Sequence, residues 1–264
     1  MHLRAPHAEH HLPTLRAFLR AHPLGVLTTA IASPTRSFPF LQSTHIPWLL
    51  DVADDESSAT ELGILRGHMA RANPQAQALI EHFKGKGEDP AADDDGAPGM
   101  LEHDVLVLFQ APAHHYVSPR FYAQTKPSTG KVVPTWDYAA VQVYGRARVY
   151  FDAKSARTDA FLQRQVGELS QMGERGVMGY EEPWSVEDAP RPYVEALKKA
   201  IIGVEVEITD MAGKWKVSQE MPEGDRKGVA EGFEGLESEV GRELAGMVRE
   251  RAELMVKKKA EGKA

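Results

Sequence analysis

Alternating apolar and polar positions recur along much of the chain and predict β-strands. The longest alternation spans residues 133–151, where odd positions from Val141 to Phe151 are mostly apolar and even positions are polar. A period of two is that of a strand with one buried face. Shorter runs predict strands at Leu24–Thr29, Phe40–Val52, Glu61–Ala70 and Val105–Gln110, and a final hairpin of Val204–Ile208 and Lys214–Val217 around a turn at Asp210–Gly213.

Apolar positions three and four residues apart predict helices between and after the strands. The expected helices are 13–21, 74–84, 155–172, 190–201 and a last one from Leu236 onward. Asn73 is a suitable N-cap for the second of them, with Pro74 at its first position. Pro47 lacks an N–H and is expected at a sheet edge or bulge. The remaining segments predict a turn at 33–37, a polar loop at 126–131 and a mobile surface insertion at 85–100, rich in Gly, Pro and Asp.

The order of these elements favours a mainly antiparallel β fold with added helices. The regular strand–helix alternation of a doubly wound parallel sheet is missing. The Gly-rich GxGxxG and GxxxxGK[ST] phosphate loops and the HExxH zinc motif are missing as well. Any nucleotide site must therefore bind phosphate through another arrangement of residues.

Composition narrows the chemistry further. The 264-residue chain has no cysteine, which excludes disulfides, Cys-based zinc sites, iron–sulfur clusters and thiol nucleophiles. Its net charge of −7 repels nucleic-acid phosphates, so direct DNA binding is doubtful without a local basic patch. No apolar run approaches the roughly 18 residues of a membrane span, and no signal-peptide pattern opens the chain. We expect a soluble, cytoplasmic protein without a membrane partner.

The run Gly67-His68-Met69-Ala70-Arg71-Ala72-Asn73-Pro74-Gln75 is a candidate anion site, because it leads from a strand into the start of a helix. Helix N-terminal amides attract anions, and the planar guanidinium of Arg71 suits a phosphate. His68 would add a donor. The alternative is that Arg71 forms a salt bridge and His68 is a structural histidine.

A second candidate segment is Val133-Pro134-Thr135-Trp136-Asp137-Tyr138. Trp136 and Tyr138 are two apart on a strand and share a face, which makes an aromatic wall with polar ends that fits a planar ring. The alternative is a cross-strand aromatic cluster in the core.

Two further segments carry weaker signals. Lys214, Lys216 and Ser218 share one face of a predicted strand. Either this face binds an anion, or its lysines keep an exposed edge strand from pairing with another chain. Adjacent histidines such as His114 and His115 point to opposite faces of a strand, so they cannot share a metal. No spacing among the 11 histidines supports a metal site. Their number leaves haem binding as an alternative.

These segments, in this order, resemble the PaiB-like family of FMN-binding negative transcriptional regulators. The resemblance covers nearly the whole chain, and its most specific stretches are GHMARANP (67–74) and VPTWDYAAVQVYG (133–145). It implies a six-stranded antiparallel split β-barrel, related to pyridoxamine-phosphate oxidase and flavin reductase barrels, with peripheral helices and a C-terminal helix. It also implies a split-barrel domain at 1–220 that carries the insertion, followed by a C-terminal helical extension at 221–264.

The resemblance further implies FMN bound at a homodimer interface. The residues it assigns to the cofactor are His68, Met69, Arg71, Asn73, Pro134, Thr135, Trp136, Tyr138, Lys216, Ser218 and Gln219. Arg71 would neutralise the phosphate, Trp136 and Tyr138 would border the ring, and Thr135 would hydrogen-bond it. Aspartate at position 137 and Met221-Pro222 depart from the family pattern, which expects asparagine at 137. No acid–base pair stands out, so the catalytic residues stay unknown.

Three functions follow from the resemblance. The first is a flavin-dependent oxidoreductase or redox-sensing protein that takes electrons from a donor to a small substrate. The second is a negative transcriptional regulator that acts through a partner or DNA, although the sequence has no helix-turn-helix signature. The third is a haem-binding or haem-degrading split barrel.

Overall fold

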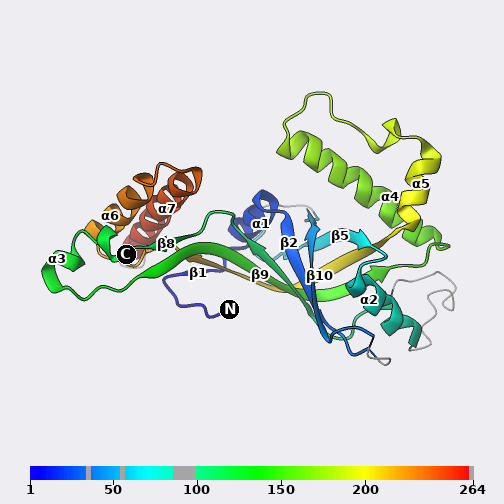
Figure 1. Ribbon diagram of the computed structural model, residues 1–264, viewed down its shortest axis with the longest axis horizontal. Helices are drawn as coiled ribbons and strands as arrows, with labels where there is room; N and C mark the ends of the chain where they lie inside the picture. Colours follow the sequence, from blue (N-terminus) through cyan, green and yellow to red (C-terminus); the bar gives the residue numbers. More distant parts are fainter. Residues whose placement is uncertain (34–36, 54–56, 86–98, 262–264) are drawn as a thin grey trace. The chain divides into compact units, whose positions relative to one another are not determined.

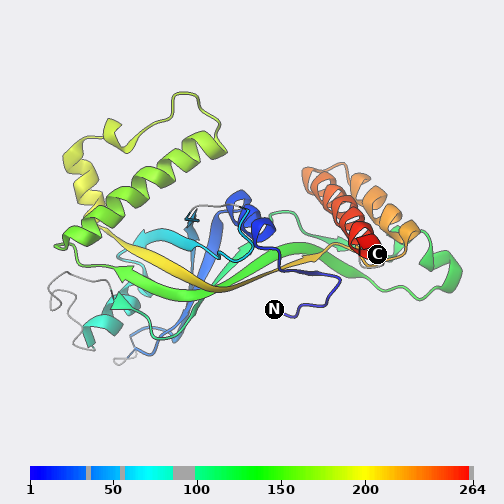
Figure 2. The ribbon, with the colours of Figure 1, turned by 180° about the vertical axis from the view of Figure 1, so that it is seen from behind.

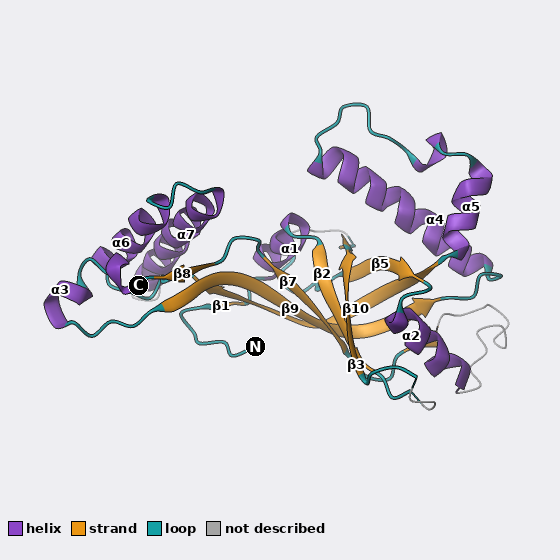
Figure 3. Cartoon of the chain, in the orientation of Figure 1, coloured by secondary structure: helices purple, strands orange, loops and turns teal. Residues whose placement is uncertain are grey.

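The computed structural model describes residues 1–33, 37–53, 57–85 and 99–261 (Figures 1 and 3). Its strands are β1 (Ala8–Glu9), β2 (Leu24–Ala30), β3 (Leu41–Pro47), β4 (Leu49–Asp51), β5 (Ile64–Ala70), β6 (Gly99–Met100), β7 (Val105–Gln110), β8 (His115–Val117), β9 (Thr135–Tyr150) and β10 (Ile201–Lys216). Its α-helices are α1 (Leu12–Ala21), α2 (Pro74–Gly85), α3 (Thr125–Thr129), α4 (Ala156–Gln171), α5 (Arg191–Lys199), α6 (Glu223–Glu234) and α7 (Glu239–Glu261). Shorter helical turns are η1 (Pro119–Phe121), η2 (Met172–Val177) and η3 (Val186–Asp188).

The strands form one sheet. Hydrogen bonds link seven of them in the order β3-β2-β7-β9-β10-β5-β4, while β1 pairs with β10, and β6 and β8 pair with β9. Six strands in the described chain, β2, β3, β5, β7, β9 and β10, have six residues or more, and the other four have two or three. The prediction of a six-stranded antiparallel fold with peripheral helices and a C-terminal helix is therefore confirmed.

The chain divides into two compact units, to which β9 and β10 both contribute. The terminal unit comprises Met1–Leu15, Gln110–Gln142 and Ala212–Ala264, and the central unit comprises Arg16–Phe109 and Val143–Met211. The boundary predicted between residues 220 and 221 stays a prediction.

In the central unit, two glycines let the strands close around Trp48, which is almost fully buried. A Cβ at Gly25 would lie 2.9 Å from the Trp48 ring, and one at Gly67 would lie 2.6 Å from Ile46 Cγ2 and 3.0 Å from the same ring. Only glycine allows this approach. Gly67 belongs to the GHMARANP run, so its place there has a packing reason.

Helix α4 lies over β5 in the central unit (Figure 1). Its N-cap is Ser155, whose hydroxyl accepts from the amide of Thr158. Arg66 of β5 is buried beneath the helix, where it donates to Gln165 and Glu168 of α4 and to Asp51 of β4. Such a buried guanidinium is tolerated because its donors are satisfied by carboxylates and an amide.

In the terminal unit, α6 and α7 pack side by side (Figures 1 and 2). Arg251 of α7 lies 3.8 Å above the ring of Trp215 and donates to Glu9 of β1 (2.9 Å). This stacked, hydrogen-bonded arginine ties the last helix to both β1 and the end of β10.

The structure corrects two strand predictions. The single strand expected over Phe40–Val52 is two: β3 pairs with β2, β4 pairs with β5, and the break falls at Trp48. Pro47 ends the edge strand β3, as its missing N–H requires. The predicted late hairpin is wrong, because β10 continues through Asp210–Gly213 without a turn.

Gly213 explains the error about the hairpin. Its residue type resembles a turn signal, but Gly213 pairs with Glu9 within the sheet. A Cβ there would lie 2.5 Å from the Trp215 ring and 2.6 Å from Leu15, so glycine serves close packing in place of a turn.

Residues 126–131, predicted as a loop, contain most of the short helix α3. The carboxylate of Asp225, in α6, accepts from the amides of Gln124 (2.8 Å) and Thr125 (2.9 Å) and from the Thr125 hydroxyl. This acceptor lies about a hundred residues away along the chain, so no local pattern announces it.

The expected insertion at 85–100 and the turn at 33–37 fall largely outside the described residues. Among the helices that are described, none combines the length and the apolar composition needed to cross a bilayer.

Candidate functional site

The predicted cofactor residues gather into two groups, one in each unit. The Arg71 group, in the central unit, consists of His68, Met69, Arg71 and Asn73. The Trp136 group, in the terminal unit, consists of Pro134, Thr135, Trp136, Tyr138, Lys216, Ser218 and Gln219.

Arg71 stands in the three-residue link between β5 and α2. Its Nε donates to the carbonyl of Lys199 (3.2 Å) and its Nη2 to that of Phe151 (2.6 Å). The salt bridge offered as an alternative is absent from the described residues around it. A guanidinium has five N–H donors, so Arg71 keeps donors for a ligand while two carbonyls fix its plane.

Asn73 is the N-cap of α2, as the sequence predicts. Its Oδ1 accepts from the amide of Gln75 (2.8 Å), and its Nδ2 donates to Thr44 (3.1 Å). Since Pro74 has no N–H and the Gln75 amide is engaged, the start of α2 offers an anion fewer amides than an uncapped helix.

His68 and Met69 point away from each other along β5. Met69 is buried in the core. Strand alternation puts His68 on the same face as Arg66, which α4 covers. Burial lowers the pKa of His68, and its Nδ1 is enclosed without a hydrogen-bond partner among the described residues. His68 is thus a neutral, half-buried histidine at neutral pH.

The Trp136 group carries an exposed aromatic surface. Trp136 is 49% exposed and Tyr116 of β8, its cross-strand neighbour, is 44% exposed. Their rings meet edge to face with centroids 6.4 Å apart, and Nε1 of Trp136 donates to Nδ1 of His114 (3.2 Å). Tyr138 lies beneath Nζ of Lys214, 5.6 Å from its ring centroid. The alternative of a buried aromatic cluster does not hold for Trp136.

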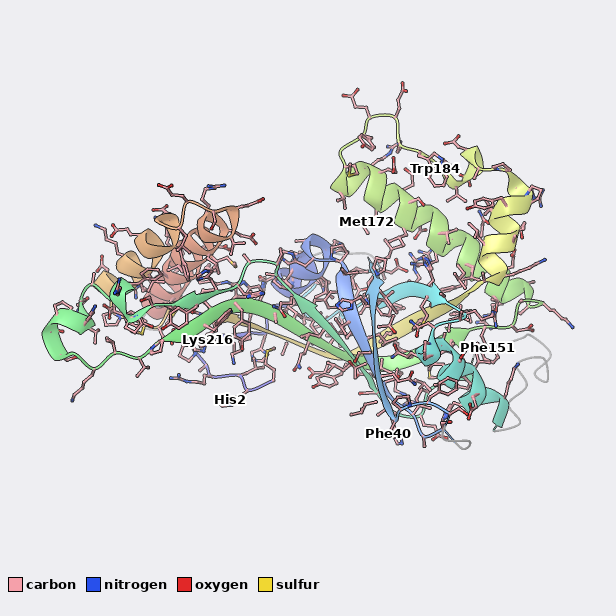
Figure 4. The ribbon with its side chains drawn as sticks, viewed as in Figure 1. His2, Phe40, Phe151, Met172, Trp184 and Lys216 are labelled. Atoms are coloured by element: carbon pink, nitrogen blue, oxygen red, sulfur yellow. The ribbon has the colours of Figure 1, made fainter. Side chains whose placement is uncertain are left out.

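Lys216, labelled in Figure 4 at the end of β10, contacts the start of β9. Its Nζ donates to the hydroxyl of Thr135 and to the carbonyl of Trp136 (2.7 Å). The structure thus brings Thr135, Trp136 and Lys216 together, as the resemblance implies.

The last two members behave differently from each other. Ser218 is buried, adopts a left-handed φ of 59° and donates to Asp137 (3.0 Å). Gln219 is engaged by the backbone: its Oε1 accepts from Val217, and its Nε2 donates to the carbonyls of Pro6 and Trp215. Gln219 therefore holds the chain after β10 and has little left for a ligand. Pro134 is exposed just before β9.

Asp137 is the residue that sequence reasoning undervalued. Its side chain is fully buried between Ser218 and Lys216, whose Nζ is 3.9 Å from Oδ1. Burial raises the pKa of Asp137 to about 7; the Ser218 hydrogen bond and the charge of Lys216 oppose the shift, and the charge of Glu220 adds to it. A titratable group beside a candidate site in this pH range is a common mark of function.

His114 and Tyr116 were also missed as neighbours of Trp136. Alternation along β8 shows which face of that strand Tyr116 occupies. Its position opposite Trp136 follows only when the strand register is known. In the described part of the chain, no cluster of three or more histidine or carboxylate side chains is placed to hold a metal ion.

Residues 1–210 match the protein family described as "Putative FMN-binding domain". The chain belongs to this family. The matched residues contain the Arg71 group and all of the Trp136 group except Lys216, Ser218 and Gln219.

Two relatives are similar to this chain over most of its length. Protein AN0679 of Emericella nidulans is 51% identical over 259 residues, which are 98% of this chain and all of that one. "Protease synthase and sporulation protein PAI 2" of Bacillus subtilis is 25% identical over 209 residues, 79% of this chain and 80% of that one. The resemblance to PaiB-like proteins is thereby confirmed.

Solved structures are more distant. The flavocytochrome Anf3 of Azotobacter vinelandii aligns with 81% of this chain and 72% of its own, at 15% identity and a TM-score of 0.42. A structure titled "F420 Reductase" aligns with 74% of this chain and 94% of its own, at 13% identity and a TM-score of 0.33. Neither extends the assignment beyond the family.

The buried carboxyl gives a pH test of folding. Between its ordinary pKa of 3.8 and about 7, Asp137 keeps its proton in the folded protein and loses it in the unfolded chain. Folding stability must therefore fall as pH rises through this range. Asp137→Asn removes this dependence, so the stability of the variant relative to wild type should rise by on the order of 3 kcal/mol between about pH 4 and about pH 8.

Urea unfolding at a series of pH values measures the difference. Asp210→Asn, at an exposed position of β10, is the matched control and should track wild type. Parallel curves for wild type and Asp137→Asn would contradict a buried, proton-holding carboxyl.

Proposed function

We propose that this chain binds FMN at a homodimer interface and works as a flavin-dependent oxidoreductase or redox-sensing protein. The observation that carries the proposal is membership of an FMN-binding family over residues 1–210. The geometry of both residue groups supports it, because each offers chemistry that one part of FMN requires.

The Arg71 group suits the phosphate. Two backbone carbonyls hold the guanidinium of Arg71 in place. Because the guanidinium is planar, the directions of its remaining N–H donors are fixed as well. Charge-assisted bonds from a preorganised arginine are among the strongest that a phosphate can receive. His68 is neutral and covered by α4, so it contributes at most hydrogen bonding after a local rearrangement, and Arg71 supplies the charge.

The Trp136 group suits the ring system. The exposed rings of Trp136 and Tyr116 offer apolar area for stacking, and their edge-to-face contact fixes their orientation. Thr135 and Lys216 add polar groups at the border of this surface. Bound FMN supplies the two-electron chemistry, while the chain binds and orients it and sets its electrostatic surroundings.

A regulatory role is the second candidate, favoured by the name of the Bacillus subtilis relative, which refers to protease synthesis and sporulation. With a net charge of −7, a regulator of this kind would act through a protein partner. The haem alternative gains no support from the family match.

Substituting Arg71→Ala should weaken FMN binding by about 30–100-fold, because it removes charge-assisted bonds to the phosphate. Riboflavin, which lacks the phosphate, should bind equally well before and after the change. Fluorescence titration of each flavin measures both affinities. Arg226→Ala is the matched control, since Arg226 also donates to a backbone carbonyl, that of Met221 (3.0 Å). Equal losses for FMN and riboflavin would remove the proposed role of Arg71.

Mixed dimers test the interface. If one subunit supplies Arg71 and its partner supplies Trp136, a dimer of one Arg71→Ala chain and one Trp136→Ala chain contains one intact and one doubly defective site. Such dimers, co-expressed with two affinity tags, should bind about one FMN each. Each variant alone should bind FMN weakly. Mixed dimers as defective as either parent would show that a single chain supplies both residues.

Electron transfer separates the enzyme from the regulator. We expect NADH or NADPH, under anaerobic conditions, to bleach the visible absorbance of the FMN-loaded protein, and a photoreductant serves as the positive control. Full bleaching by the photoreductant without any response to either nicotinamide would exclude these donors. A salt-sensitive gel shift with DNA would favour direct regulation instead.

A further inference from the structure

A cation and a buried acid lie close together next to the backbone of Trp136. Nζ of Lys216 donates to Thr135 and to the Trp136 carbonyl, and lies 3.9 Å from Oδ1 of Asp137. The Lys216 side chain is 24% exposed, whereas Asp137 has no exposed surface. Lys216 therefore connects the buried carboxyl to the backbone of Trp136 and to solvent.

We propose that Asp137 is a positioning residue that sets the charge which Lys216 presents to a flavin ring at the Trp136 group. This inference rests on the proposed function and adds to it a control of the bound cofactor. An ionised Asp137 offsets the ammonium of Lys216, and the pair is neutral overall. A protonated Asp137 leaves the ammonium uncompensated. Because the carboxyl is enclosed by protein, solvent screens this coupling less than it screens a surface pair.

Ser218 holds the carboxyl in this place. Its Oγ lies 3.0 Å and 3.3 Å from the two carboxyl oxygens of Asp137. Ser218 does so from a left-handed backbone conformation, with a φ of 59°, which is uncommon for a residue other than glycine. Such conformations persist where the surrounding structure holds the residue in place, and they cluster at functional sites.

Other titratable groups lie near Asp137, and two of them, Lys216 and Glu220, shift its pKa. Glu220, after β10, raises its pKa and itself lies 3.0 Å from Nε2 of His7. His115 is its cross-strand partner on β8, and Tyr122 follows η1. Burial is the main cause of the raised pKa, and Lys216 opposes it. The carboxyl is therefore half ionised near neutral pH, where a small change in its surroundings changes its charge.

The expected consequence concerns the reduced cofactor. Uptake of two electrons and one proton gives the neutral flavin ring one negative charge, and an uncompensated ammonium stabilises a nearby negative charge. The preference of the site for reduced over oxidised FMN should therefore grow when Asp137 is neutral.

The first arm of the test uses the FMN-free protein. Carbon-13 NMR of labelled aspartate side chains should show Asp137 titrating near neutral pH. Lys216→Met should raise this pKa, because it removes a positive charge that favours the ionised form. Lys214→Met is the matched control from the same strand face and should leave the titration unchanged. An unchanged Asp137 titration in Lys216→Met would overturn the proposed coupling between Asp137 and Lys216.

The second arm measures the reduction potential of the FMN-loaded protein, with dithionite as reductant and a reference dye. At about pH 8, Asp137→Asn should raise the ratio of affinities for reduced and oxidised FMN by about tenfold, which is about 30 mV for a two-electron couple. At about pH 5.5 the difference should vanish, because wild-type Asp137 is then protonated.

The failures are distinguishable. A difference in reduction potential between Asp137→Asn and wild type that is equal at both pH values, or absent at both, overturns this inference. It leaves the proposal of FMN binding intact. A wild-type chain that takes up no FMN overturns the proposed function, and the role of Asp137 toward a flavin with it.

Discussion

The pairing of the two long strands β9 and β10 within the sheet is the constraint on which both candidate groups depend. Each strand has 16 residues, and a buried strand must satisfy its N–H and C=O groups along its whole length. Thr135 and Lys216, the first residue of β9 and the last of β10, meet through a side-chain hydrogen bond. Arg71 in turn donates to Phe151, just after β9, and to Lys199, just before β10. The chemistry is thus fixed to the ends of two strands.

One of these places holds a buried acid in an unusual setting. Asp137 places a carboxyl where strand alternation expects an apolar side chain, and Ser218 adopts a backbone conformation that usually needs glycine. Natural sequences break such local rules mainly where function compensates for the lost stability. Arg66 is buried too, but its donors are satisfied by Asp51, Gln165 and Glu168, which is consistent with a purely structural role.

Much of the fold could be predicted from periodicity alone. The alternation that predicts β9 and the Asn73 cap that predicts α2 are local signals, and the structure confirms both. Features that depend on distant residues could not be predicted this way. Gly213 resembles a turn residue until Leu15 and Trp215 are known to pack against it, and α3 needs an acceptor from Asp225. The candidate site follows the same division. Trp136 stands out from the strand alternation and Thr135 from the family resemblance, whereas Tyr116 and the buried state of Asp137 depend on register and packing.

Whether the chain binds FMN can be read from an absorbance spectrum. Purified protein is incubated with excess FMN, freed of unbound flavin by gel filtration, and scanned beside riboflavin-treated and untreated samples. We expect the visible flavin bands to elute with the FMN-treated protein, at up to about one FMN per chain. Protein that elutes colourless, with all of the flavin in the small-molecule fraction, would contradict it.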